Sequence, residues 1–185
     1  MKFLSSLILI IYLAPSMLFS MSFHQEPLYC KLAAELRAQS AKKLEKKHQM
    51  SFCGTAGGMM DNINLLGFSF LINRPMTKNE VRMLAVSSTQ DFLNDINQDE
   101  KVRQYLKIYP FDIEHIEITF LFRTHDQGTV YHPNLAVVSV YNGKIKYSTN
   151  NPLNDNRFLV QETETFEDAV KILNGEIPAP ESQIK

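Results

Sequence analysis

The beginning of this chain limits which residues can belong to its folded part. After Lys2, a mostly apolar run without a single charged side chain extends to Phe23. A positive start followed by an apolar stretch is the pattern of a secretory signal peptide, and Ser20 and Ser22 supply the small residues typical of a cleavage site. We therefore expect residues 1–22 to be removed, which leaves the rest of the chain to form the core.

The alternative is that the same segment stays in place as a membrane anchor. A transmembrane helix needs about 20 predominantly apolar residues, and this stretch is interrupted near its end by Pro15 and Ser16. Under both interpretations Lys2 stays on the cytoplasmic side and the body of the protein crosses the membrane. The sequence therefore predicts an exported protein, periplasmic or secreted, with no second membrane span after the leader.

Charge and length narrow the class of protein further. The 19 Lys and Arg side chains are balanced by 20 Asp and Glu, so the formal net charge is −1. Nucleic-acid-binding domains carry a clear basic excess, so we do not expect DNA or RNA as a partner. The length predicts one domain, at residues 23–175. Residues 176–185 contain Pro178 and Pro180 and are expected to form a flexible tail.

Apolar residues recur with helical or strand spacing through most of the chain. The spacing predicts helices at 27–48, 77–97, 99–107 and 165–175, and strands at 63–73, 114–123, 136–141, 144–149 and 157–161. Most strands come late and follow one another closely, which favours antiparallel pairing. We expect an α+β fold in which a mainly antiparallel sheet of about four to five strands carries helices on one face.

Two short motifs predict where elements begin and turn. Thr77 is followed three residues later by Glu80, which is the spacing of a capping box at a helix N-terminus. Asn142 and Gly143 lie between two predicted strands, and this pair is preferred in type I′ hairpin turns because both positions need positive φ.

A glycine-rich run precedes the first predicted strand. Gly54, Gly57 and Gly58 fall within five positions, which predicts a tight structural turn. Backbone amides of such a loop could instead bind an anion, but the residues of a phosphate-binding loop are missing. Met59 and Met60 follow directly and are a candidate binding surface, since methionine side chains adapt to varied partners. The alternative is that both methionines belong to the core.

The two cysteines, Cys30 and Cys53, are a candidate disulfide in an exported protein. The bridge would close a loop of about 23 residues and stabilise the fold by roughly 3 kcal/mol in the chain-entropy model. The alternative is two free thiols, because spacing in the sequence does not fix the distance between them.

Cys53 is also the one candidate nucleophile. A catalytic cysteine needs a nearby base, and His125 or His132 could supply one. The same histidines with Asp126 offer ligand types that zinc prefers, although their spacing matches no metal motif. None of the usual signatures of catalytic cysteines or of cofactor binding is present, so we expect no cofactor and no metal.

Four short runs of the sequence look familiar. They are GTAGGM at 54–59, DFLNDIN at 91–97, KVRQYL at 101–106 and YPF at 109–111. Together they resemble a group of small exported bacterial proteins without assigned function, over residues 31–150. The resemblance implies export and a compact domain, and it implies no activity, cofactor or catalytic residue.

These observations favour a binding function over catalysis. Export without a catalytic motif predicts a non-enzymatic module that binds a protein or another component of the cell envelope. Such a module should expose an apolar patch or a strand edge. The competing hypothesis is a small hydrolase or ligand-binding domain with a site around Cys53, His125 and His132.

Overall fold

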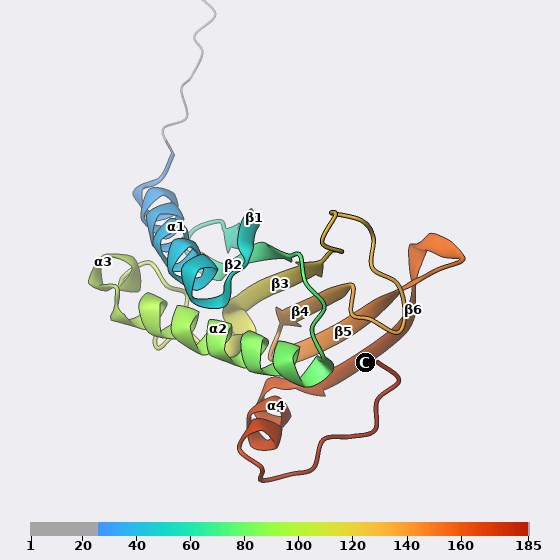
Figure 1. Ribbon diagram of the computed structural model, residues 1–185. Coiled ribbons are helices and arrows are strands. Elements are labelled where there is room, and N and C mark those ends of the chain that lie inside the picture. Colours follow the sequence, from blue (N-terminus) through green and yellow to red (C-terminus); the bar gives the residue numbers. More distant parts are fainter. Residues whose placement is uncertain (1–25, 185) are drawn as a thin grey trace, which may run out of the picture.

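The computed structural model describes residues 26–184, apart from the side chain of Asp155. The helices are α1 (Leu28–His48), α2 (Lys78–Gln98), α3 (Glu100–Arg103) and α4 (Phe166–Leu173), with a 3-10 turn at Ile113–His115. The strands are β1 (Ser51–Met59), β2 (Ile63–Ile72), β3 (Ile116–Phe122), β4 (Val137–Tyr141), β5 (Lys144–Asn151) and β6 (Asn154–Thr165) (Figure 1).

All six strands form one sheet in the order β1-β2-β3-β4-β5-β6. Neighbouring strands are antiparallel except β2 and β3, which are parallel because α2 crosses over between them. The predicted α+β class is therefore confirmed. The predicted number of strands is wrong, since this is a mixed sheet of six strands rather than a mainly antiparallel sheet of four to five.

The strand that the sequence did not predict is β1. It contains the glycine-rich run, and its residues pair with β2 from Ser51 opposite Leu71 to Met59 opposite Ile63. The prediction of a tight turn was wrong because these glycines are used in extended backbone, whereas the glycines with positive φ in the described part are Gly143 and Gly175.

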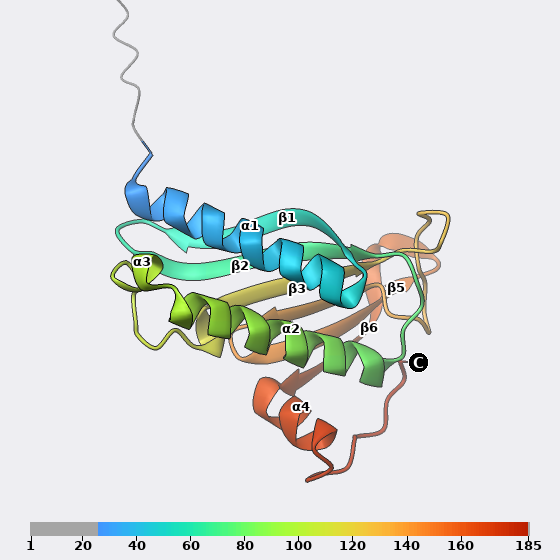
Figure 2. The same cartoon turned by 60° about the vertical axis from the view of Figure 1, so that its left-hand side comes forward.

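Helices α1, α2 and α4 lie on one face of the sheet (Figure 2). Side chains alternate along a strand, so every second residue points toward these helices. Phe68 on β2 and Phe92 on α2 are fully buried, with ring centroids 4.3 Å apart. On the opposite face, Leu71, Leu121 and Val137 form a row across three strands that no described helix covers.

The predicted helix cap and the predicted hairpin turn are both confirmed. Thr77 Oγ1 accepts a hydrogen bond from Glu80 N–H at 3.3 Å, and Glu80 accepts one from Thr77 N–H at 2.7 Å, which completes the capping box. Asn142 and Gly143 both have positive φ, at 49° and 68°, between β4 and β5.

The C-terminal segment returns along β6, where the sequence predicted a flexible tail. Ser182 Oγ donates to Glu162 at 2.9 Å, and the backbone N–H of Gln183 donates to the same carboxylate at 2.9 Å. Ile184 is only 5% exposed and belongs to the core cluster. Part of the segment is therefore packed against the domain.

Candidate functional site

β1 lies at one edge of the sheet and pairs only with β2. The strand carries no charged residue and no proline, and Ser51, Phe52, Cys53, Thr55 and Gly57 are exposed. Strand edges present unpaired backbone N–H and C=O groups, and proteins usually protect them with charges, proline or irregular pairing. Register shifts flank the central stretch of β1, which pairs regularly between residues 54 and 58. This short uncharged stretch is the candidate binding site.

Helix α1 runs beside β1 and partly protects it (Figure 2). Glu45 Oε1 accepts a hydrogen bond from the backbone N–H of Phe52 at 2.6 Å. Arg37 Nη1 donates to the carbonyl of Ala56 at 2.9 Å, and burial lowers the pKa of this guanidinium. These two side chains contact one backbone group each.

The three glycines of β1 differ in what surrounds them. A Cβ on Gly57 would lie 3.0 Å from Arg37 Nη1, so glycine makes room for the guanidinium. The nearest heavy atom to a Cβ on Gly54 would be the Cβ of Ser69 at 3.9 Å, and on Gly58 that of Leu65 at 3.5 Å, which are ordinary contacts. The proposed anion-binding loop is not formed, because these residues are paired with β2.

The two methionines after the glycines have different surroundings. Met59 is half-buried and packs against the core, as the alternative prediction stated. Met60 is 84% exposed in the turn between β1 and β2. Its carbonyl oxygen accepts a hydrogen bond from the hydroxyl of Tyr29 near the start of α1. Of the two methionines, Met60 is therefore the one that is available as an adaptable contact beside the edge.

Cys30 and Cys53 are both free thiols. Tyr29 contacts Met60 at one end of β1, whereas Glu45 contacts Phe52 at the other end. The two cysteines adjoin these opposite ends, which are about 22 Å apart along α1 at 1.5 Å per residue. Disulfides need Cα atoms within about 7 Å, so in this fold the predicted bridge between the two cysteines is not formed.

Cys53 has no histidine partner in the described part of the chain. The ring of His132 lies 3.3 Å from Thr149 Oγ1 on β5, four strands from β1. Strands are about 4.8 Å apart, which separates Cys53 from His132 by about 19 Å. Partial burial raises the pKa of the Cys53 thiol, whereas a nucleophilic cysteine needs a lowered pKa.

The other predicted candidates do not form a site with Cys53. His125 lies in the loop after β3 and lines a cavity with Arg74 and Met76. Asp126 Oδ1 accepts a hydrogen bond from Thr124 Oγ1 at 2.5 Å, which lowers the pKa of this carboxyl group. Among residues 26–184, no group of three or more His, Cys, Asp and Glu side chains could hold a metal ion.

The opposite edge of the sheet, β6, contains a charged network that the sequence did not predict. Glu164 forms a bidentate ion pair with Arg82 of α2, at 2.8 and 2.9 Å, and accepts a hydrogen bond from Tyr147 Oη at 2.5 Å. Arg82 is 2% exposed. The hydrogen bonds to Glu164 raise the pKa of Arg82, and burial raises that of Tyr147.

A second ion pair attaches the C-terminal segment to the same edge. Lys78 of α2 contacts Glu162, which also accepts hydrogen bonds from Ser182 and Gln183. Burial alone would raise the pKa of Glu162, but these donors outweigh it and the pKa is lowered. The sequence carries a faint signal here, because Lys78 and Arg82 are one helical turn apart and the two glutamates alternate along a strand.

Among residues 26–184, no helix is long and apolar enough to cross a membrane. The chain matches no protein-family model, and comparisons with curated proteins and with solved structures found no match. The resemblance to small exported bacterial proteins therefore stays a prediction, and a functional assignment has to follow from the arrangement of this chain's own residues.

Proposed function

We propose that this protein is an exported, non-enzymatic binding module that takes up an extended segment of a partner protein beside β1. The observation that carries the proposal is the difference in protection between the sheet edges: among the described residues, β1 has no charged residue of its own, and apart from β2 its backbone is hydrogen-bonded only by Glu45 at Phe52 and by Arg37 at Ala56. Addition of a strand to a free edge supplies affinity through main-chain hydrogen bonds.

The contacts around β1 suggest how a partner segment would be held. Residues 54–58 offer regular extended backbone of a length that suits a short peptide. The small side chains of Gly54, Ala56 and Gly58 allow close approach of another chain. Met60 lies at the end of this stretch and can adapt to an apolar side chain of the partner.

The export part of the proposal comes from the sequence of the first 22 residues, which lie outside the described part. The non-enzymatic part is supported by the surroundings of Cys53, whose thiol has a raised pKa and lies four strands away from β5, where His132 contacts Thr149. A catalytic role for Cys53 with His132 has no geometric support.

Peptides of random sequence provide a test of strand addition at β1. Binders are selected from a displayed library on the purified protein, and their affinities are measured against two variants. Thr55→Lys places a charge on β1, and Thr163→Lys places the same charge on β6; both threonines are exposed. We expect Thr55→Lys to lower the affinity of the selected peptides at least about tenfold, and Thr163→Lys to leave their affinity unchanged.

A chemical control distinguishes strand addition from side-chain contact. Methylation of alternate backbone nitrogens of the peptide removes the donors that face β1 and should abolish binding, while methylation of the intervening nitrogens should have little effect. Peptides that bind equally well to Thr55→Lys, or that tolerate methylation at every position, would contradict the proposal.

A further inference from the structure

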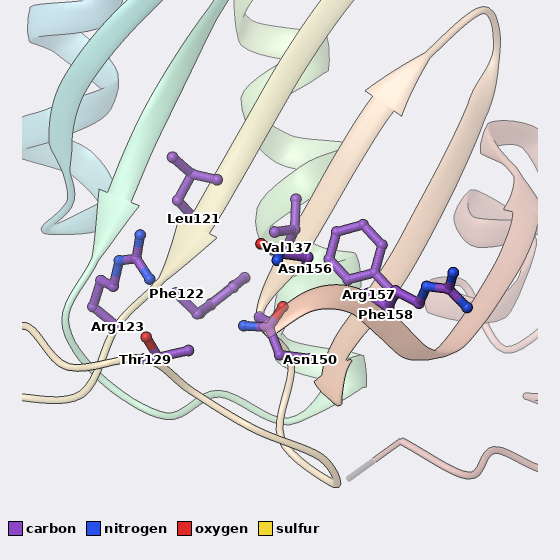
Figure 3. A pocket seen from close by; sticks show the side chains of 10 residues that line it. Leu121, Phe122, Arg123, Thr129, Val137, Asn150, Asn156, Arg157 and Phe158 are labelled. Carbon is purple, nitrogen blue, oxygen red and sulfur yellow. The ribbon is translucent and has the colours of Figure 1, made fainter. Parts of the chain in front are cut away.

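A cavity of about 290 Å³ lies at the end of the sheet where β3 and β4 approach the hairpin between β5 and β6 (Figure 3). One wall is apolar and comes from Leu121, Val137 and Phe158. Leu121 and Val137 are direct cross-strand partners on the face that no helix of the described residues covers. This site lies across the sheet from the charged network and does not include β1.

The polar part of the cavity is rich in hydrogen-bond donors. The side chain of half-buried Arg123 makes no ion pair or hydrogen bond with the described residues, and neither do those of Thr129 and Asn156. None of the ten lining residues is acidic. Among the side chains that the structure describes, the cavity therefore combines a guanidinium without an ion pair and further hydrogen-bond donors with no negatively charged group.

Arg123 also lines a second cavity, of about 270 Å³. That cavity is lined mainly by apolar groups, among them Met76, Val130 and Leu135, together with His125. Arg123, directly after β3, therefore lines two partly apolar spaces. A hydrated inorganic ion would leave these apolar walls without a contact.

We propose that the cavity in Figure 3 binds a small organic anion that carries one carboxylate on an apolar body. The planar guanidinium of Arg123 matches a carboxylate in a bidentate pair. Thr129 and Asn156 can donate to the same oxygens, and Leu121, Val137 and Phe158 contact the body of the ligand. One arginine balances a single negative charge, and the volume is at the lower end of the range for ligand sites.

The second arginine of the lining supplies a matched control. In Figure 3 the side chain of Arg157 extends away from Arg123 and from the other lining groups. Arg157 has no ion pair either with the described residues, and it carries the same charge at a similar place on the surface. Loss of the Arg157 charge should therefore weaken the long-range attraction of an anionic ligand but not the direct contact between that ligand and Arg123.

The test is a nuclear magnetic resonance titration of the isotopically labelled protein with three probes. The probes are phenylacetate, its neutral isostere phenylacetamide, and inorganic phosphate. We expect phenylacetate to shift the amides of residues 121–123, 129, 137 and 156–158, with a dissociation constant of roughly 1 mM or lower. Phenylacetamide and phosphate should bind at least about tenfold more weakly, because each lacks one of the two contacts.

Variants decide whether the contact with Arg123 is direct. Arg123→Gln should weaken phenylacetate at least about tenfold, and Arg157→Gln less than about threefold. Phe158→Ala, at an exposed position, should also weaken the binding of phenylacetate and serves as a second variant. The proposal is overturned if phenylacetate shifts none of these amides, if phenylacetamide binds as well, or if Arg123→Gln and Arg157→Gln have equal effects.

Discussion

The two edges of the sheet are protected in opposite ways. β6 carries Glu162 and Glu164, which bind α2, and the C-terminal segment lies beside it. β1 is uncharged, and only Glu45 and Arg37 of α1 contact its backbone among the described side chains. An edge that is not needed for binding is normally blocked. The fold therefore closes one edge with its own residues and leaves a short stretch of the other accessible.

The largest effect is expected from the buried ion pair at the protected edge. Arg82→Met removes the partner of Glu164 and leaves a carboxylate that is only 9% exposed without its cation. Breaking a buried pair in this way should destabilise the protein by about 3–5 kcal/mol, measured by urea unfolding. Lys43→Met breaks an exposed pair with Asp95 and should cost less than about 1 kcal/mol. Equal losses would mean that the network does not stabilise this edge.

A smaller effect is expected from the C-terminal segment. Deletion of residues 181–185 exposes the surface under Ile184 and removes the donors from Ser182 to Glu162. The loss of one buried aliphatic side chain and its neighbouring hydrogen bonds should cost about 2 kcal/mol. Thermal and urea unfolding measure the change. An unchanged free energy of unfolding would show that the segment is not attached to β6 in solution.

The glycines of β1 should tolerate substitution to different extents. In Gly54→Ala the added Cβ makes only an ordinary contact with the Cβ of Ser69 and φ is not positive, so lower entropy of the unfolded chain should stabilise the protein by about 0.5 kcal/mol. A Cβ at position 57 would lie 3.0 Å from both Arg37 Nη1 and Met59 Cε, so Gly57→Ala should displace Arg37 from the carbonyl of Ala56 and destabilise the protein by about 0.5–1 kcal/mol. If the two variants have the same stability, Arg37 does not protect this part of the edge.

The smallest effect is a dependence of the C-terminal contacts on pH. The lowered pKa of Glu162 means that its ionised form is stabilised in the folded protein. This contribution is complete above the ordinary glutamate pKa of about 4.5 and is lost as the pH falls through the lower folded value. Amide exchange at Gln183 should therefore lose protection, relative to the core, below about pH 4.5. Constant protection down to pH 2 would contradict the role of Glu162.

Strong local signals predicted most elements of this fold. The capping box at Thr77 and Glu80 and the turn at Asn142 and Gly143 act between neighbouring residues, so a single sequence is enough to detect them. β1 was missed because glycine and alanine give no apolar alternation, and the strand is defined by its pairing with β2. Pairing with a distant strand cannot be detected in the local sequence of a segment without apolar alternation.

The candidate site was predicted in part. Gly54, Gly57, Gly58, Met59 and Met60 were chosen from the sequence as candidate binding residues in a loop, and their position at a sheet edge follows only from the strand order. The pair of Arg82 and Glu164 joins residues 82 positions apart. Likewise, the sequence offered Cys53 and His132 as partners, and the order of strands places them far apart.

Residue-resolved amide exchange of β1, with and without a peptide selected on the protein, tests whether this edge is accessible and binds a partner segment. We predict that the outward-facing amides between Gly54 and Gly58 exchange rapidly in the free protein and become at least about tenfold slower in the complex. Amides of β6 should be unaffected. If the peptide slows exchange elsewhere and leaves β1 unchanged, or if β1 is already fully protected in the free protein, the accessible edge is not the binding site.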